Sequence, residues 1–264
     1  MRFLLVFGLA AALAGAAAPA SAQVAPKGEI IFDAPPPARP PADAALVQQD
    51  TLIYDRAIQA KSFAELAKFE PELNKVLEHV PTRFPLFEKR PGQVIVRADR
   101  DTGGPIARAM AQELLDANPQ TSVKISFEPN VYGFAALTVG ALAAERKDYA
   151  AALMALNTGA SVQPDNPKIL AERGHALAML GRLPEAMSLL LSWRRDYRLQ
   201  AQLSPSDTAR VLRAIGFVMT EQKRYPDAQA SYEDALKLEP AEPTALAALK
   251  RIEQLRTGAA PQAR

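Results

Sequence analysis

The chain of 264 residues contains no cysteine. This absence excludes disulfides, cysteine-ligated metal sites and the lipid anchor that a bacterial lipoprotein carries on an N-terminal cysteine. Histidine is almost as scarce, because only His79 and His175 are present and they are far apart in the sequence. A metal site needs three or four convergent ligands, and the sequence has neither HxxxH nor HExxH spacing. We therefore expect no metal and no cofactor.

Other features of enzymes and of nucleic-acid-binding proteins are missing as well. No GxSxG motif is present, so the sequence offers no nucleophilic serine of the hydrolase type. The 31 basic and 29 acidic residues nearly cancel, which argues against a nucleic-acid partner. Aromatic residues make up only 6% of the chain while alanine is abundant, a composition that suits closely packed helices.

Long apolar runs are also missing, with one exception at the N-terminus. Met1 and Arg2 precede the apolar run 3–18, and the small residues Ala20-Ser21-Ala22 follow it. This pattern predicts a signal peptide over residues 1–22, with cleavage before Gln23. The run is short for a membrane span of about 20 residues, so a retained anchor is the weaker alternative. We expect a periplasmic protein, or alternatively a secreted one, without a transmembrane anchor after cleavage.

Proline is concentrated directly after this leader. Residues 23–42 contain six prolines and few large apolar side chains, so they predict an extended linker. A proline-rich ligand for a partner domain is the functional alternative. At the other end of the chain, residues 257–264 predict a disordered tail.

Residues 43–129 predict a mixed N-terminal module. Apolar residues between Leu46 and Val80 recur at helical spacing, and Pro71 should start a turn or kink the second helix. The string AIQAKSFAEL could belong to a degenerate helical repeat. His79 stands before Pro81 at a helix end, where a charged cap is expected.

Residues 91–128 have a different pattern. A short β-like run, Gln93–Arg97, precedes an amphipathic segment from Ile106 to Ala117 with Pro105 at its start. Residues Ser122–Phe127 then alternate polar and apolar, as a half-buried strand does. Strand, helix and strand form the minimal unit for two parallel strands. The alternative is a degenerate helical repeat whose turns resemble strands.

One loop in this segment could carry chemistry. Residues 99–105, DRDTGGP, contain two aspartates and two glycines before the expected helix. Backbone amides at a helix start can hold an anion, and two aspartates could hold a cation. The loop lacks the lysine of a phosphate-binding loop, so a turn that caps the helix is the plainer interpretation.

The most informative pattern lies in the C-terminal half, where one sequence pattern recurs three times. Gly140 and Gly174 are 34 residues apart, and so are Ala152 and Ala186. Such a period indicates stacked helical units that cannot bury their apolar faces alone. Residues 130–256 therefore predict three helical hairpins and a final capping helix. The apolar stripe of that helix should comprise Leu246, Leu249, Ile252 and Leu255, with Arg251 among the residues on the solvent face.

These repeats resemble the tetratricopeptide repeat, a 34-residue helix–turn–helix unit with small residues where its helices cross. The landmark residues are Gly140, Tyr149, Ala152, Leu156, Gly159 and Pro164, then Leu170, Gly174, Leu177, Leu183, Ala186 and Leu190, then Leu212, Gly216, Tyr225, Ala228, Tyr232, Ala235 and Pro240. The resemblance covers under half of the chain. It implies a mainly α fold, a tetratricopeptide solenoid with a small α/β N-terminal module.

The second repeat departs from the family pattern. Trp193 and Arg198 stand where a small residue and a proline are expected, and eight residues are inserted within 199–208. We expect the preceding helix to continue past Arg198, Ser204 to cap the next helix, and the stack to bend here. Trp193 should fill the extra space in the core, with ligand contact as the alternative.

The resemblance also implies a concave groove lined by the first helix of each repeat. Its expected binding residues are Phe134, Leu137, Lys168, His175, Met179, Arg210, Arg213 and Phe217, with Ala141, Ala171 and Thr220 beside them. This surface is apolar at one end and basic at the other, so it suits an extended peptide with an acidic group. Thr138 and Glu172 replace asparagines of the family's carboxylate clamp, so we expect no clamp of that kind.

The sequence therefore predicts an exported, non-catalytic adaptor that binds a peptide or protein partner of the cell envelope. Its N-terminal module should dock on the first repeat, because three repeats are near the minimum for a stable stack. Two alternatives remain open. One is an enzyme or enzyme subunit with a site in residues 91–128, and the other is a structural protein that binds cell-wall polymer.

Overall fold

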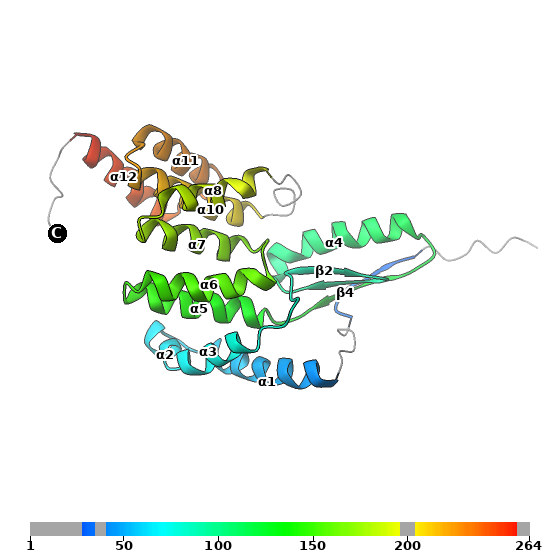
Figure 1. Cartoon of the computed structure of the whole chain (residues 1–264). Coiled ribbons are helices and arrows are strands. Elements are labelled where there is room, and N and C mark those ends of the chain that lie inside the picture. The colour runs from blue at the N-terminus through cyan, green and yellow to red at the C-terminus, as the bar shows by residue number, and fades with distance from the viewer. Residues whose placement is uncertain (1–27, 35–40, 196–203, 258–264) are drawn as a thin grey trace, which may run out of the picture.

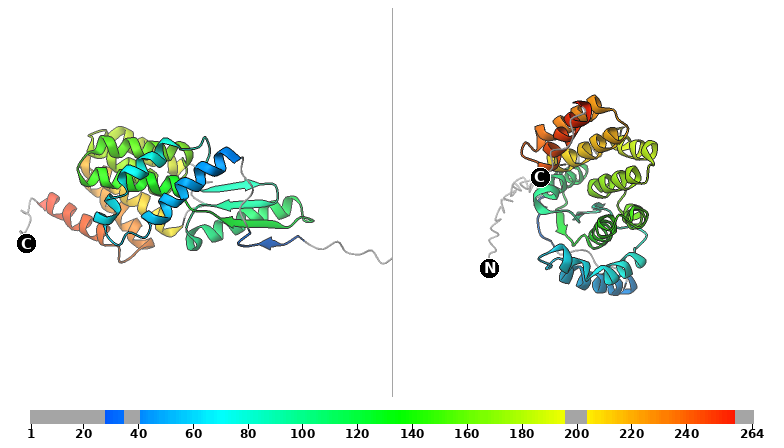
Figure 2. Two further views of the ribbon diagram at one scale, coloured as in Figure 1. Left: turned by 90° about the horizontal axis from the view of Figure 1, so that it is seen from below. Right: turned by 90° about the vertical axis from the view of Figure 1, so that its left-hand side faces the viewer.

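The computed structural model describes residues 28–34, 41–195 and 204–257. These residues form a stack of helices, from which a small sheet and one helix project to one side (Figure 1). Seen along the helices, the stack curves into an arc, and the sheet and its helix lie within that arc (right panel of Figure 2). The predicted signal peptide and C-terminal tail lie outside the described residues, apart from Thr257.

Three helical hairpins form the centre of the stack, as the repeat pattern predicts. Their helices are α5 (Val131–Glu145) and α6 (Tyr149–Val162), α7 (Pro167–Met179) and α8 (Leu183–Arg195), and α10 (Pro205–Glu221) and α11 (Tyr225–Leu238). Each first helix packs on its own partner and on the first helix of a neighbouring hairpin. The fold class, a mainly α helical-hairpin solenoid, is confirmed.

Glycines let the two helices of each hairpin approach closely. A Cβ atom added at Gly140, Gly174 or Gly216 would lie 2.8–2.9 Å from a side chain of the facing helix. The facing residues are Leu156, Leu190 and Tyr232. Contacts this short are tighter than van der Waals packing allows, so any larger residue at these positions would force the facing side chain to shift. The resemblance implies the same packing, with a small residue of one helix against a large residue of the other.

Short polar residues cap the starts of the repeat helices. The side chains of Asn130, Asp148, Asn166 and Ser204 each accept a hydrogen bond from a backbone N–H in the first turn of α5, α6, α7 or α10. Such caps satisfy amides that have no partner within the helix. The predicted role of Ser204 is confirmed.

The helices before the repeats cover one end of the stack. They are α1 (Pro41–Ala57), α2 (Phe63–Ala67) and α3 (Glu70–Glu78), with Pro71 in the first turn of α3. Leu73 and Val76 pack in one apolar cluster with Val131 and Tyr132 of α5. The predicted docking of the N-terminal module on the first repeat is confirmed.

A buried carboxylate strengthens this contact. The Tyr132 hydroxyl donates to Asp50 Oδ2 over 3.0 Å, and His79 Nδ1 lies 3.6 Å from Asp50 Oδ1. Burial raises the pKa of Asp50, although the hydrogen bonds from Tyr132 and His79 oppose that rise. His79 does stand at the C-cap of α3, where the sequence places it, and Asp50 is its unforeseen neighbour.

A four-stranded sheet completes the module, in the order β1-β4-β3-β2. The strands are β1 (Ile30–Ile31), β2 (Phe87–Arg90), β3 (Gln93–Val96) and β4 (Val123–Phe127). Strands β3 and β4 are parallel, with helix α4 (Arg100–Ala117) packed on both of them. The predicted strand–helix–strand unit is confirmed, and the alternative of a degenerate repeat is wrong.

Two predictions about this module need correction, and one strand was missed. The linker over 23–42 is wrong at Ile30–Ile31, which pairs in parallel with β4, and at Pro41, where α1 begins. Strand β2, which pairs antiparallel with β3, was not predicted. Helix α4 begins at Arg100 rather than at Ile106, so residues 100–105 form its first turns and Pro105 lies inside it.

The region of the inserted residues is described only at its edges. Trp193 is 6% exposed and packs with Leu190, Val211 and Ile215, so its core role is confirmed. The predicted continuation of α8 past Arg198 lies outside the described residues. Helix α12 (Pro243–Thr257) closes the stack through Ala245 and Ile252, whereas Leu246 and Leu255 of the predicted stripe are exposed.

Candidate functional site

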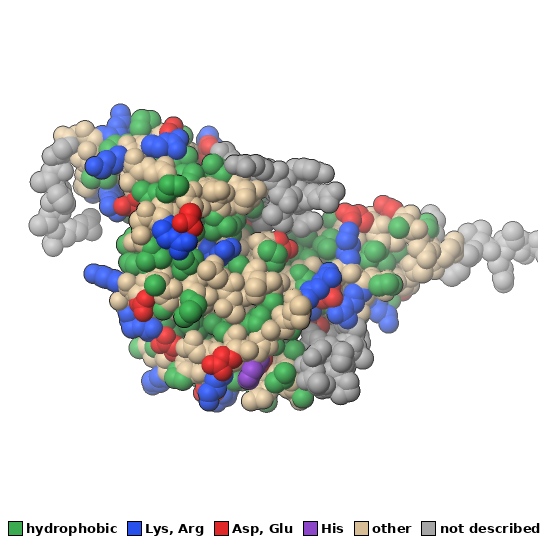
Figure 3. All heavy atoms as spheres, viewed as in Figure 1, with side chains coloured by type: hydrophobic (Ala, Val, Ile, Leu, Met, Phe, Trp, Pro, Cys, Tyr) green, Lys and Arg blue, Asp and Glu red, His purple; other side chains and the backbone are tan. Residues whose placement is uncertain are grey.

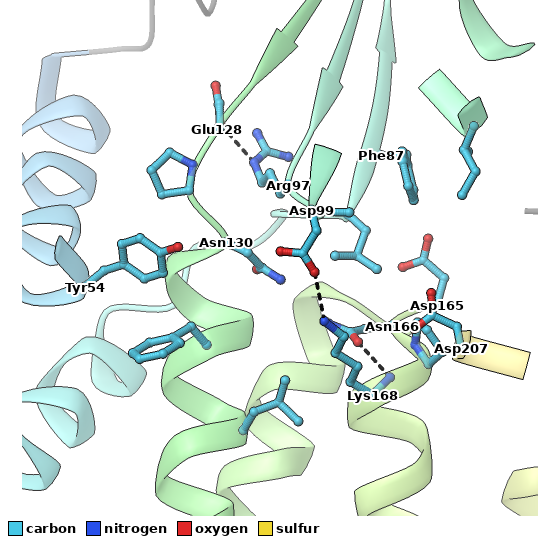
Figure 4. Close-up of a pocket in the computed structure, with 17 residues that line it drawn as sticks. Tyr54, Phe87, Arg97, Asp99, Glu128, Asn130, Asp165, Asn166, Lys168 and Asp207 are labelled. Atoms are coloured by element: carbon cyan, nitrogen blue, oxygen red, sulfur yellow. Dashed lines mark hydrogen bonds and ion pairs between the residues drawn. The ribbon is translucent and has the colours of Figure 1, made fainter. Parts of the chain in front are cut away.

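The first helices of the repeats line two separate cavities. One, the junction pocket, has a volume of about 230 Å³ and lies between the sheet and the N-terminal ends of α5, α7 and α10 (Figure 4). The other, the groove pocket, has a volume of about 570 Å³ and lies among α7, α10, α11 and α12. The predicted groove is thus divided: Phe134, Leu137 and Lys168 line the junction pocket, while His175, Arg210, Arg213 and Phe217 line the groove pocket.

A chain of side-chain amides fixes one wall of the junction pocket. Gln163 Nε2 donates to Asn130 Oδ1 over 2.6 Å, and Asn166 Nδ2 donates to Gln163 Oε1 over 2.8 Å. Asn166 Oδ1 in turn accepts from the backbone amides of Lys168 and Ile169. Because Gln163 is fully buried, this chain links the caps of α5 and α7 rigidly.

A buried arginine organises the opposite wall, at the end of the sheet. Arg97 is 2% exposed and donates from Nε to Glu128 Oε2 over 2.9 Å. It also donates to the carbonyl of Pro85 and to Glu88, and its guanidinium lies 4.0 Å from the centre of the Phe84 ring. Burial alone would raise the pKa of Glu88, but hydrogen bonds and charges from Arg90 and Arg97 hold it below its usual value.

An ion pair joins the two walls. Lys168 Nζ of α7 lies 3.1 Å from Asp99 Oδ2, at the N-cap of α4 (Figure 4). On another side of the pocket, the rings of Tyr54 and Phe134 meet edge to face at 5.1 Å. Lys168 therefore lines the junction pocket while it pairs with the module, and its contact with a partner stays a prediction.

Two further carboxylates, Asp165 and Asp207, have no cationic partner among the described residues. Asp165 Oδ1 is buried without a hydrogen-bond partner, and burial raises the pKa of this carboxyl despite an opposing backbone hydrogen bond. Asp207 follows the cap of α10 and accepts a hydrogen bond from the Ser204 hydroxyl. Both side chains line the junction pocket and are drawn in Figure 4.

The groove pocket has a flat aromatic wall. The rings of His175 and Phe217 are stacked at 4.4 Å with an interplanar angle of 8°. Tyr232 also lines the pocket, and burial raises its pKa to about 12, so its hydroxyl stays neutral at ordinary pH. This wall offers apolar surface to a ligand that lies along α7 and α10.

Arg213 is already engaged within the protein. Its guanidinium bonds to Glu239, and Nε lies 3.6 Å from Glu242, both in the turn between α11 and α12. The pKa of Glu239 is lowered by hydrogen bonds from Ser206 and from Arg213. Arg213 thus joins α10 to the turn before α12 while it lines the groove pocket, and its contact with a partner stays a prediction.

Arg210 differs from Arg213. It lines the groove pocket, and its Nε is buried without a hydrogen-bond partner among the described residues. Arg251 of α12 is exposed, as predicted, and it also lines the pocket and lies 3.7 Å from Glu221. We did not predict from the sequence that the capping helix also lines the groove, although the position of this helix directly after the third hairpin indicates it.

The remaining expected site residues are less informative. Met179 is 40% exposed and lines neither pocket. Within the loop singled out in the sequence, Asp99 pairs with Lys168 and Arg100 pairs with Asp33 over 2.6 Å. No group of three or more metal-ligating side chains occurs among the described residues.

The surface and helices add two further observations. Acidic and basic side chains are interspersed over the face in Figure 3, in line with the small net charge. Along the described ranges, every helix is too short or too polar to cross a bilayer.

No protein-family model matches the chain, and no curated protein matches its sequence. Similar solved structures include the first tetratricopeptide domain of Spaghetti (RPAP3) bound to an HSP90 peptide, with 21% identity, 48% of this chain and 94% of that chain covered, and a TM-score of 0.38. The Sgt2 tetratricopeptide domain of Aspergillus fumigatus has 22% identity and a TM-score of 0.38, and the match covers 50% of this chain and 86% of that chain. PilF of Pseudomonas aeruginosa has 17% identity and a TM-score of 0.39, and the match covers 60% of this chain and 65% of that chain. The chain is thus similar to tetratricopeptide proteins, while its fold class rests on the helix packing described above.

Proposed function

We propose that this chain is an exported, non-catalytic adaptor whose groove pocket binds an acidic segment of a protein partner in the cell envelope. The observation that carries the proposal is the buried Nε of Arg210, which has no hydrogen-bond partner among the described residues and belongs to a side chain in the wall of this pocket. A buried N–H without an acceptor costs free energy, so the site favours a ligand that supplies one. A carboxylate is the acceptor that suits arginine best, since it forms charge-assisted hydrogen bonds.

The size and lining of the pocket suit a peptide segment. Its volume of about 570 Å³ falls within the range of roughly 300–1,000 Å³ that is typical of ligand sites. The stacked rings of His175 and Phe217 offer apolar contact next to the arginine. A segment with an acidic residue beside an apolar one therefore matches both parts of the wall.

The proposed location rests on the N-terminal sequence. Residues 1–22 combine a basic start, an apolar run and a small-residue cleavage site. We expect the mature protein to begin at Gln23 and to occupy the periplasm. Fractionation of cells, followed by N-terminal sequencing of the protein, checks both expectations. An uncleaved protein in the membrane fraction would contradict them.

The experiment that tests the adaptor function is crosslinking inside living cells. A photoreactive phenylalanine analogue replaces Phe217 in the groove pocket, and the captured partner is identified by mass spectrometry. The matched control places the analogue at Met154, which is 69% exposed and lines a different surface. We expect a specific protein at position 217 and none of it at 154. Equal capture at both positions, or capture of cell-wall polymer only, would overturn the proposal.

A further inference from the structure

The structure also points to a second binding site, which differs from the groove pocket in the charge of the ligand that it favours. We propose that the junction pocket binds an organic cation, a primary ammonium group carried on an apolar or aromatic body. The site is separate from the groove pocket and takes the opposite charge. It uses cavity walls from both the α/β module and the repeats, so it exists only in the assembled chain.

The charges that line the junction pocket do not balance. Arg97 bonds to Glu128, and Lys168 pairs with Asp99, so both cations of the lining are engaged. Asp165 and Asp207 have no cationic partner among the residues that the structure describes, although Asp207 accepts a hydrogen bond from Ser204. A ligand that brings one positive charge would compensate them, because a carboxylate oxygen shielded from solvent without a partner, such as Asp165 Oδ1, is costly.

The geometry of Asp165 strengthens this argument. Its Oδ1 is shielded from solvent, and the described part of the chain places no donor within hydrogen-bonding distance of it. Burial holds the pKa of this carboxyl above its usual value. A bound cation would lower that pKa, because it stabilises the ionised carboxylate. The ammonium of Lys168 lies 3.1 Å from Asp99 Oδ2 and pairs with that acid (Figure 4).

The rest of the lining selects the body of the ligand. The aromatic rings of Tyr54, Phe87 and Phe134 line the pocket, with aliphatic side chains between them. Aromatic faces attract cations and bury apolar groups equally well. The volume of about 230 Å³ is below the range for drug-sized ligands, so the pocket suits a small amine or a single lysine side chain.

Calorimetric titration of the full mature chain with 2-phenylethylamine tests the proposal. Its uncharged counterpart, 2-phenylethanol, has nearly the same shape and serves as the ligand control. We expect the amine to bind at least about tenfold more tightly than the alcohol to the wild type, and Asp165→Asn to abolish this difference. Asp116→Asn is the matched protein control, since Asp116 is exposed near the end of α4 and lines neither pocket.

Each outcome decides the question. Equal affinity for amine and alcohol, or discrimination that survives in folded Asp165→Asn protein, would overturn the proposal. A short peptide with one lysine is titrated beside the free amine, with its acetyl-lysine form as the uncharged control. The comparison of peptide and amine separates the two sources of the ammonium group, a protein side chain and a small amine. Tighter binding of the peptide than of the free amine assigns the pocket to a protein side chain, and the reverse assigns it to a small amine. Crosslinking at Phe217 is independent of both results.

Discussion

The repeat array and the α/β module pack their elements in different ways. In the array, glycines let apolar side chains of the facing helix fill each crossing, as Gly174 does with Leu190. In the module, the end of the sheet is held by the buried charges of Arg97, Glu88 and Glu128. The array therefore keeps most of its charged groups on its surfaces, while the buried charges of the module pair with one another.

This difference also bears on the two pockets. The array contributes Arg210 to the groove pocket and Asp165 to the junction pocket, each with one buried atom that has no hydrogen-bond partner among the described residues. The module contributes Arg97, Asp99 and Glu128 to the junction pocket, and its arginine there is fully engaged. The following substitutions test this comparison.

The largest effect is expected in the module, from Arg97→Met. Removing one partner of a buried ion pair leaves an uncompensated charge, which costs about 3–5 kcal/mol of the free energy of unfolding. Arg182→Met is the control, because its pair with Glu185 is exposed and exposed pairs contribute about 0–1 kcal/mol. Urea unfolding measures both variants. Similar losses for the two would show that the Arg97 network is not the main support of the sheet.

The second effect concerns close packing in the array, through Gly159→Ala. The new Cβ would lie 2.5 Å from the Cβ of Ala136, which cannot rotate away, so we expect a loss of about 1–3 kcal/mol. Gly104→Ala in α4 is the matched control, because no atom lies within 4 Å of its Cβ position. That change should stabilise the protein by about 0.5–1 kcal/mol. A neutral Gly159→Ala variant would contradict the close packing of α6 on α5.

A smaller effect separates the two arginines of the groove pocket. Arg213→Met should lower the free energy of unfolding by on the order of 1 kcal/mol, since its ion pairs with Glu239 and Glu242 are only partly buried. It should also speed hydrogen exchange in α12. Arg210→Gln should leave exchange in α12 unchanged. Faster exchange in both variants would mean that Arg210 supports the stack as Arg213 does.

The smallest effect is a pH dependence from Asp165. Burial raises its pKa in the folded state, so the ionised carboxylate destabilises the fold above that pKa. As the pH falls through the folded pKa towards the unfolded value of about 3.9, this destabilisation is lost. Relative to Asp165→Asn, the wild type should therefore gain stability over that window. Urea unfolding of both proteins at several pH values measures the difference, and a constant difference would contradict the raised pKa.

The repeat array could be predicted from the sequence because its signals are local. Two landmarks with one period, Gly140 to Gly174 and Ala152 to Ala186, place the helices, and Ser204 marks the restart after the insertion. Strand β1 could not be predicted, because two isoleucines near a proline-rich segment form a strand only when β4 is beside them. Strand β2 reads FEKR, with no β-branched residue, so pairing with β3 outweighs its weak propensity.

The candidate sites were predicted only in part, for a related reason. The resemblance to the tetratricopeptide repeat implied the inward positions of the first helices, and these led to Arg210, His175 and Phe217. The junction pocket combines residues as distant as Tyr54 and Asp207, which meet only through tertiary packing. Whether an arginine is engaged also depends on its neighbours: Arg213 meets the turn before α12, whereas Arg210 Nε meets no acceptor among the described residues.

The most direct test of the central claim is the affinity of the partner segment captured at position 217 for the wild type and for Arg210→Gln. The account predicts that Arg210→Gln weakens binding at least about tenfold while the melting temperature stays the same. Arg182→Gln, far from the groove pocket lining, should bind as the wild type does. Unchanged affinity in folded Arg210→Gln protein would contradict the claim that this arginine receives an acidic partner.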